Sequence, residues 1–126
     1  MCRNLGWRYG IEVEFNNNIG PGLQLVHPYG ITINPASKLG NNVTVYKGVT
    51  IGSIRYGNRK GVPQIGDNVI LCANSFVCGG ITIGSNVLIA ANAFVNFDVP
   101  DNCIVIGNPG KIIPKDNVVD MIAAEK

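Results

Sequence analysis

Aliphatic residues recur at every sixth position through the middle of the chain, and this period restricts the fold more than any other feature of the sequence. A period of six fits neither an amphipathic helix nor a simple alternating strand. It fits a coil of three short parallel strands joined by tight corners, with the aliphatic side chains stacked inside. One inward set is Ile65, Leu71, Val77, Ile83, Ile89 and Val95, and a second, four positions later, is Val69, Ser75, Ile81, Val87, Ala93 and Val99. The period predicts an all-β protein, a parallel β-helix of hexapeptide repeats.

The expected corners also repeat. The sequence Ile-Gly-Asp-Asn-Val at 65–69 returns as Ile-Gly-Ser-Asn-Val at 83–87, and Pro-Asp-Asn-Cys at 100–103 takes the equivalent place one turn later. Gly, Asn and Asp tolerate the positive φ angles that a sharp corner requires. We therefore expect these residues at the turns of the column.

Composition favours one compact domain without a nucleic-acid or membrane partner. The chain has 126 residues, of which 46% are hydrophobic and 14% charged, and its net charge of +2 is too small for a concentrated basic face. No apolar run reaches membrane-spanning length, and residues 1–4 lack the apolar segment of a secretory signal. These features predict a cytoplasmic protein.

The four cysteines are expected to be free thiols. Cys72 and Cys78 hold the same place in consecutive hexads and so belong to different faces of the column, where they cannot share a metal ion. Cys2 and Cys103 have no partner at CxxC spacing. Free thiols fit a reducing compartment, and no metal is expected.

The six-residue register is interrupted twice. The corner at 39–43 lies 26 residues before that at 65–69, which is one coil plus eight, so an extruded loop is expected at about 53–64. The corner at 19–23 lies 20 residues before the next, and its two extra residues fall within 25–32, around His27, the only histidine. Insertions on a repeat scaffold commonly carry binding and catalytic groups. His27 is thus a catalytic candidate, although a surface turn explains a lone histidine equally simply.

A family resemblance covers most of the chain, from about residue 9 to 113. In order, the segments resemble the catalytic domain of serine O-acetyltransferases and their relatives in polysaccharide gene clusters. This resemblance implies a left-handed parallel β-helix, a homotrimer with sites between subunits, and acetyl-coenzyme A as donor. The matching segments are 9–13 (YGIEV), 19–23 (IGPGL), His27, 49–52 (VTIG), 63–67 (PQIGD) and 107–113 (GNPGKII).

The resemblance also implies catalytic roles. His27 aligns with the family's histidine, which as a general base would remove the proton of the attacking hydroxyl. Glu12 aligns with an aspartate that orients this histidine. The alternative is that Glu12 is only a solvated surface charge. Glu14 ranks lower, because successive residues of a strand face opposite sides.

Donor binding is implied by the same alignment. Backbone N–H groups near Gly52 and Ser53 would stabilise the oxyanion. Ala73 and Ala91 match positions where coenzyme A approaches the strand edges, and Lys111 is a candidate partner for a coenzyme A phosphate. Each of the last three residues also has a plain structural explanation, as a small corner residue or a solvated lysine. None of the cysteines matches a catalytic position, so direct transfer is expected.

The acceptor is where the resemblance weakens. Val26, Gly61 and Val62 stand where serine acetyltransferases have an aspartate, an arginine and a histidine. Without those partners, holding a zwitterion is costly. We therefore expect a saccharide or another small alcohol as acceptor, with serine as the alternative. A non-catalytic trimeric scaffold stays open, whereas a zinc hydratase on this fold requires three histidines and the chain has one.

Three segments are expected along the chain. Residues 1–12 would form an amino-terminal cap, and 13–113 the β-helix with its extruded loop. Residues 114–126 mix apolar and charged side chains and predict a short helix, capped by Asp116 or Asn117, at the open end of the column.

Overall fold

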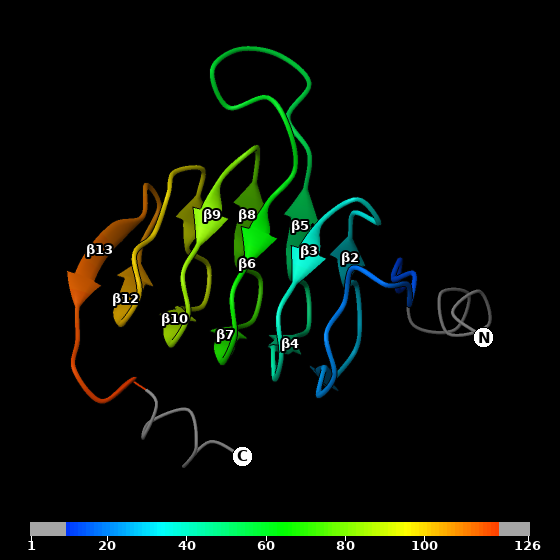
Figure 1. Ribbon diagram of the computed structural model, residues 1–126, viewed down its shortest axis with the longest axis horizontal. Coiled ribbons are helices and arrows are strands. Elements are labelled where there is room, and N and C mark those ends of the chain that lie inside the picture. Colours follow the sequence, from blue (N-terminus) through cyan, green and yellow to red (C-terminus); the bar gives the residue numbers. More distant parts are fainter. Residues whose placement is uncertain (1–9, 119–126) are drawn as a thin grey trace.

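The computed structural model describes residues 10–118, which form a three-sided column of short strands (Figure 1). Each turn of the chain adds one strand to each side, so sequence neighbours lie on different sides. The strands are β1 (Gln24–Val26), β2 (Thr32–Ile33), β3 (Lys38–Leu39), β4 (Thr44–Tyr46), β5 (Thr50–Gly52), β6 (Gln64–Ile65), β7 (Val69–Leu71), β8 (Phe76–Cys78), β9 (Thr82–Ile83), β10 (Val87–Ile89), β11 (Phe94–Val95), β12 (Cys103–Ile106) and β13 (Lys111–Pro114).

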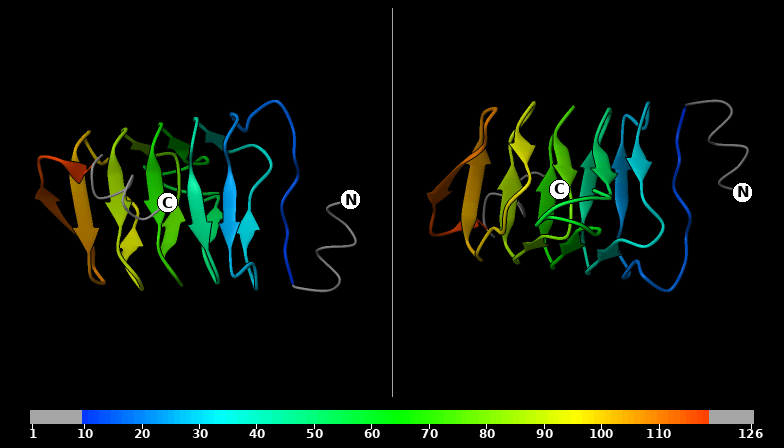
Figure 2. Two further views of the ribbon diagram at one scale, coloured as in Figure 1. Left: turned by 90° about the horizontal axis from the view of Figure 1, so that it is seen from below. Right: turned by 90° about the horizontal axis from the view of Figure 1, so that it is seen from above.

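Three sheets form the sides of the column. The six-stranded sheet has the order β1-β4-β7-β10-β12-β13, the four-stranded sheet β2-β5-β8-β11, and the three-stranded sheet β3-β6-β9. All pairs are parallel except β12 with β13, which is antiparallel. Figure 2 shows the coils stacked side by side along the column. The predicted parallel β-helix of hexapeptide repeats is confirmed.

The core is a column of aliphatic side chains, as the period predicts. Val45, Leu71, Ile89 and Val105 stand in register on neighbouring strands of the six-stranded sheet, and all four are fully buried. Ser75 of the second inward set is also fully buried, and its hydroxyl has no hydrogen-bond partner. One continuous cluster therefore holds the three sheets together.

The corners have the predicted backbone. Asparagine takes a positive φ at one turn after another. Side chains then link neighbouring coils, because Asp67 Oδ1 accepts a hydrogen bond from the N–H of Asn41 at 2.7 Å, and Ser85 Oγ accepts one from the N–H of Asp67 at 2.9 Å. The corner asparagines are Asn42, Asn68, Asn74, Asn86, Asn92 and Asn102.

Strand pairing locates the eight-residue insertion. Thr32 pairs with Thr50, eighteen positions on, whereas Lys38 pairs with Gln64, twenty-six positions on, so the eight extra residues lie between β5 and β6. They form the hairpin 54–61, which projects from the column in Figure 1 and is closed by an antiparallel bridge between its two end residues. The extruded loop predicted at 53–64 is confirmed.

The last coil is two residues shorter than the hexad register predicts. That register places Val99 eighteen positions after Ile81, but Val99 instead bridges Ile83, and Val87 pairs with Cys103. The predicted place of Val99 is therefore wrong by two, because the corner after β11 turns in fewer residues. The place predicted for 100–103 is correct.

The end of the chain departs from the prediction. Residues 111–114 form the antiparallel strand β13, so the parallel repeat predicted up to residue 113 does not include them, and residue 114, predicted as the start of a helix, ends a strand. Val118 is fully buried against Ile70, on the outer face of the six-stranded sheet and not at the end of the column, so the predicted placement of this segment is wrong at its start. The predicted helix over the remaining residues lies outside the described part, as does nearly all of the predicted amino-terminal cap. Among residues 10–118, no helix is long and apolar enough to cross a membrane.

Candidate functional site

His27 lies on an exposed corner between the six-stranded and four-stranded sheets. β1 ends at Val26 and β2 begins at Thr32, so the chain makes this corner with two more residues than the next coil uses between Tyr46 and Thr50. The insertion predicted around His27 is confirmed. The N–H of Tyr29 donates to the carbonyl of His27 at 2.7 Å, which makes a tight turn.

The backbone of His27 is unusual. Its φ is 48°, and the other non-glycine residues with positive φ in the described part are all asparagine. Such conformations outside Gly and Asn are uncommon and concentrate at functional sites. The imidazole is exposed and free to meet a ligand.

A line of corner residues extends from His27 along one edge of the column, here called the His27 edge. Backbone hydrogen bonds connect it from coil to coil: Gly48 N–H to Tyr29 at 2.8 Å, Asn74 N–H to Lys47 at 2.9 Å, and Asn92 N–H to Ala73 at 3.0 Å. Its members are Tyr29, Lys47, Ala73 and Ala91. Tyr29 and Lys47 were not predicted as site residues. They occupy the same corner as Ala73 on earlier coils, and this shared position in the repeat could have identified them.

Lys111 continues the same edge at the far end. β12 runs toward this edge as β7 and β10 do, the turn 107–110 follows, and Lys111 then starts β13 opposite Ile106. Its side chain is exposed. From the coil of Tyr29 to this turn there are four strand spacings, about 19 Å.

Glu12 lies one coil away from the insertion that carries His27. Its N–H donates to the carbonyl of Ile31 at 2.8 Å, and its carbonyl accepts from the N–H of Ile33 at 2.8 Å. Both Glu12 and His27 are exposed, and no side-chain hydrogen bond or ion pair joins them in this structure of residues 10–118. The structure thus places them on adjoining coils without a hydrogen bond or ion pair between them.

Glu14 is on the same face as Glu12, which corrects the prediction that separated them. Ile11 and Val13 are buried, whereas both glutamates are exposed. Residues two apart on an extended segment face the same side, so alternation does not exclude Glu14.

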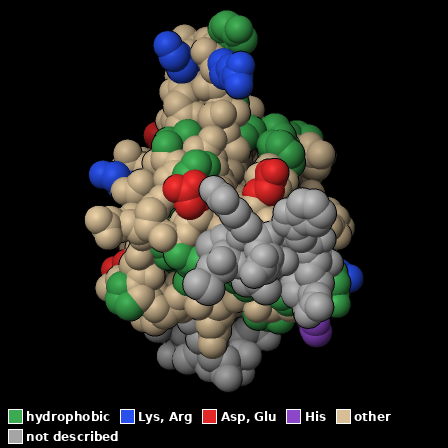
Figure 3. Space-filling view, turned by 90° about the vertical axis from the view of Figure 1, so that its right-hand side faces the viewer, with side chains coloured by type: hydrophobic (Ala, Val, Ile, Leu, Met, Phe, Trp, Pro, Cys, Tyr) green, Lys and Arg blue, Asp and Glu red, His purple; other side chains and the backbone are tan. Residues whose placement is uncertain are grey.

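Gly52 and Ser53 lie on a different edge, at the foot of the hairpin. The N–H of Gly79 donates to the carbonyl of Gly52 at 3.0 Å, and the N–H of Gly80 to that of Arg59 at 2.8 Å. In Figure 3 the Lys and Arg side chains at the tip of the hairpin and the chain's single histidine lie at opposite ends of the view. One chain therefore does not bring Gly52 and Ser53 to His27.

The hairpin itself is cationic. Arg55, Arg59 and Lys60 are exposed, and none of them forms an ion pair with a carboxylate of the described residues. Tyr56 is 83% exposed at the tip. The hairpin thus offers positive charge and an aromatic ring away from the column.

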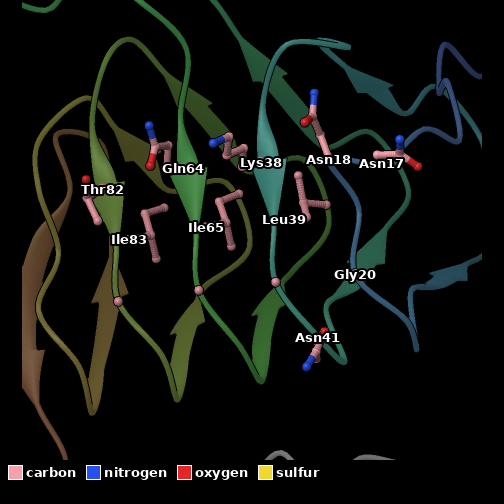
Figure 4. A pocket seen from close by; sticks show the side chains of 13 residues that line it. Asn17, Asn18, Gly20, Lys38, Leu39, Asn41, Gln64, Ile65, Thr82 and Ile83 are labelled. Carbon is pink, nitrogen blue, oxygen red and sulfur yellow. The ribbon is translucent and has the colours of Figure 1, made fainter.

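A groove of ≈ 580 Å³ runs along the three-stranded sheet, away from His27 (Figure 4). Its lining includes Lys38, Gln64 and Thr82 from neighbouring coils, but no histidine, cysteine or carboxylate. Glycines form one border because the next coil is close: a Cβ on Gly66 would lie 2.6 Å from Ser85 Oγ. The groove therefore follows from corner packing and carries no acid–base pair.

The cysteines of the described part form no disulfide and lie apart from one another. Cys72 follows β7 of the six-stranded sheet and Cys78 ends β8 of the four-stranded sheet, so their predicted placement on different faces is confirmed. Burial raises the pKa of Cys78, and burial together with the charge of Asp101 raises the pKa of Cys103. Thiols with raised pKa values are poor nucleophiles near neutral pH. Between residues 10 and 118, no three His, Cys, Asp or Glu side chains are grouped to hold a metal ion.

Comparison with known proteins adds sequence and structural relatives. The family model "Bacterial transferase hexapeptide (six repeats)" matches residues 63–96. The serine acetyltransferase of Staphylococcus xylosus is 42% identical over 107 residues, covering 85% of this chain and 50% of that protein. The chain spans about half the length of the curated relatives that it matches.

The solved structures that resemble this chain are also serine acetyltransferases. Neisseria gonorrhoeae serine acetyltransferase in complex with serine has a TM-score of 0.69 and 40% identity, covering 75% of this chain and 38% of that one. A serine acetyltransferase in complex with CoA has a TM-score of 0.68 and 27% identity, covering 82% of this chain and 39% of that one.

Proposed function

We propose that this chain, a serine acetyltransferase-like member of the hexapeptide-repeat acyltransferase family, transfers an acetyl group from acetyl-coenzyme A to a hydroxyl group. The observation that carries the proposal is His27, the only histidine, exposed on a two-residue insertion in a left-handed backbone conformation. A neutral imidazole at such a site is suited to accept a hydroxyl proton near pH 7.

The reaction needs one base and no covalent enzyme intermediate. His27 removes the acceptor's hydroxyl proton as the oxygen attacks the thioester carbonyl carbon. The C–S bond then breaks, and the protonated imidazole returns the proton to the departing thiolate of coenzyme A. Glu12, on the adjoining coil, turns toward the other ring nitrogen and acts as the positioning residue that stabilises the imidazolium.

Acetyl-coenzyme A lies along the His27 edge in this proposal. Ala73 is half-buried and Ala91 exposed, and their small side chains leave the backbone accessible to an extended ligand. Lys111, at the far end of the edge, meets a phosphate. The related serine acetyltransferase solved with CoA supports this choice of donor.

A homotrimer completes each site. The face of the four-stranded sheet lies between the His27 edge and the hairpin edge, and it carries Phe76, which is 43% exposed and stacks on Phe94 with ring centroids 5.7 Å apart. Association through this face brings the hairpin of one subunit beside His27 of the next. Gly52 and Ser53 then supply oxyanion donors across the interface. The cysteines of the described part form no disulfide, which fits a cytoplasmic location, where thiols stay reduced.

Serine is the first acceptor to test, ahead of the saccharide predicted from the sequence. The relatives at 42% and 40% identity are serine acetyltransferases, and one was solved with serine. A saccharide is the second candidate acceptor. The reason is that no charge is offered to a zwitterion by Val26, Gly61 and Val62. A panel of serine, sugars and nucleotide sugars, assayed by release of free coenzyme A thiol, identifies the acceptor as the compound that gives the highest kcat/KM.

Replacing His27 tests the proposed chemistry. We expect His27→Ala to lower kcat by roughly 10²- to 10⁴-fold, the usual contribution of a general base, with an unchanged circular dichroism spectrum and unchanged Tm. Thiol release from acetyl-coenzyme A with the best acceptor measures the rate. Equal rates for His27→Ala and the wild type would remove His27 from the mechanism. A wild-type protein that transfers acetyl to none of the acceptors would leave the scaffold function in its place.

A further inference from the structure

A lysine lies on the coil that follows His27, at the matching place on the same edge. β1 and β4 pair in register, Val26 with Tyr46, so His27 and Lys47 are the residues that follow two paired strand ends. The N–H of Gly48 donates to the carbonyl of Tyr29 at 2.8 Å and ties the two corners together. Neighbouring coils are about 4.8 Å apart. A small ligand that meets the imidazole is therefore within reach of the Lys47 side chain.

The charge of Lys47 is available to a ligand. Its side chain is exposed, and no ion pair joins it to a carboxylate within residues 10–118. Glu12 belongs to the coil before His27, on the side away from Lys47. The other cations of the described part lie elsewhere, on the three-stranded sheet, on the hairpin and in or directly after β13; they are Lys38, Arg55, Arg59, Lys60, Lys111 and Lys115.

Lys47 is too close to His27 to meet a phosphate of coenzyme A that lies extended along the edge. About thirteen bonds separate the thioester sulfur from the nearest phosphorus, and an extended chain covers about 3.5 Å for every three bonds, or about 15 Å in all. Lys47 is one strand spacing from the coil of His27, whereas Lys111 is about three spacings further on. With the thioester at His27, the phosphates come near Lys111. An anion beside Lys47 must then belong to the acceptor.

We propose that Lys47 binds a carboxylate of the acceptor, an assignment that rests on the proposed acetyl transfer. The ammonium group donates hydrogen bonds to the carboxylate while His27 accepts the proton of the hydroxyl group. Lys47 supplies the positive charge that Gly61 and Val62 lack. The acceptor is accordingly a small hydroxy acid, either a hydroxy amino acid such as serine or a uronic acid, and not a neutral sugar.

Two matched pairs of acceptors isolate the carboxylate. Serinamide keeps the hydroxyl and ammonium groups of serine but has no carboxylate, and glucose differs in the same way from glucuronic acid. In the pair that the wild-type enzyme acetylates, we expect kcat/KM to be about tenfold or more higher for the acid, because a hydrogen bond to a charged group contributes about that much. Release of coenzyme A thiol measures the rates.

Replacing Lys47 tests its part in this preference. Lys47→Met is expected to raise the KM for the acid about tenfold, and to leave unchanged the rate with the neutral acceptor and the KM for acetyl-coenzyme A. Lys47→Arg keeps the charge and is expected to retain the preference for the acid. Lys38→Met removes an exposed lysine from the three-stranded sheet and is the matched control, expected to change none of these constants.

The outcomes separate this assignment from the proposed function. Acetyl transfer by the wild type with an unchanged preference for the acid in Lys47→Met would overturn the role of Lys47 and leave the proposed function standing. Equal losses with the acid and the neutral acceptor would also overturn it, as would loss of the preference in Arg59→Met alone, which would assign the carboxylate to the hairpin. A wild type that acetylates no acceptor would remove the proposed function itself.

Discussion

His27 has a backbone conformation that elsewhere in residues 10–118 belongs to glycine and asparagine, and its neighbourhood explains why. Two residues more than the next coil uses must fit between β1 and β2, while Tyr29 keeps its backbone bond to the coil above. A left-handed residue costs of order 1–3 kcal/mol outside glycine. The stacked coils hold the turn in place and present the imidazole at the surface.

Glu12 and Glu14 differ in their expected effect on the rate. We expect Glu12→Gln to lower kcat at least about tenfold with little change in the KM for acetyl-coenzyme A, because the imidazole loses its orienting carboxylate. Glu12→Asp is expected to restore part of the rate, and Glu14→Gln, the matched control on the same face, to leave it unchanged. Steady-state kinetics measure both constants. If Glu14→Gln carries the loss instead, the two roles must be exchanged.

The position of the hairpin 54–61 depends on how its base packs against Gly79 of the next coil. A Cβ on Gly79, whose φ is 92°, would lie 2.8 Å from the carbonyl oxygen of Arg59 and 2.9 Å from Ile54 Cδ1. The glycine therefore lets the hairpin pack directly on the next coil. Its cations are held at a defined place on the column.

Gly79→Ala is expected to loosen this attachment. The added methyl group meets the hairpin backbone in a left-handed conformation, so we expect a loss of about 1–3 kcal/mol in the free energy of unfolding. Gly57→Ala at the tip is the control, because Gly57 also has a positive φ but open space around it, and a smaller loss of about 1 kcal/mol is expected. Urea denaturation measures both. Equal losses for the two variants would mean that the close packing of the hairpin on Gly79 contributes nothing to the free energy of unfolding.

At the scale of the whole molecule, the four-stranded side of the column carries a stacked pair of aromatic rings, one of them exposed. The Phe76 and Phe94 pair lies on the four-stranded sheet between the two edges that carry the predicted site residues. The three-stranded side is polar, and the six-stranded side begins to be covered by Val118. In the trimer that we propose, association through the phenylalanine side unites His27 of one subunit with the hairpin of the next.

Phe76→Asp is expected to dissociate the proposed trimer and to lower activity at the same time, because a charge on the proposed association face opposes its burial. Gln64→Asp places the same charge at the outward position of the three-stranded sheet and should alter neither. Sedimentation velocity gives the assembly state and thiol release gives the activity. A monomeric variant with full activity would contradict sites shared between subunits.

Much of the fold was predictable because a hexad is a local pattern that each coil repeats. The period in Ile65, Leu71 and Val77 determined which side chains enter the core, and the breaks in that period located the His27 turn and the hairpin. Asparagines at the corners followed from backbone sterics alone. The break made His27 a candidate, but the role expected of His27 as a base, and the choice of Glu12, came from the family resemblance.

Other features depended on how coils stack and could be read only from the tertiary structure. Val99 lies two positions away from its predicted place in the register, because the length of a corner is set by the strands it joins. Val118 packs on the side of the column because the outer row of the six-stranded sheet is apolar. The separation of Gly52 from His27 likewise appears only when the three edges are placed in space. Sequence by itself determined the repeat and its interruptions, whereas the tertiary structure decided which edges and faces meet, because those contacts join residues one or more coils apart.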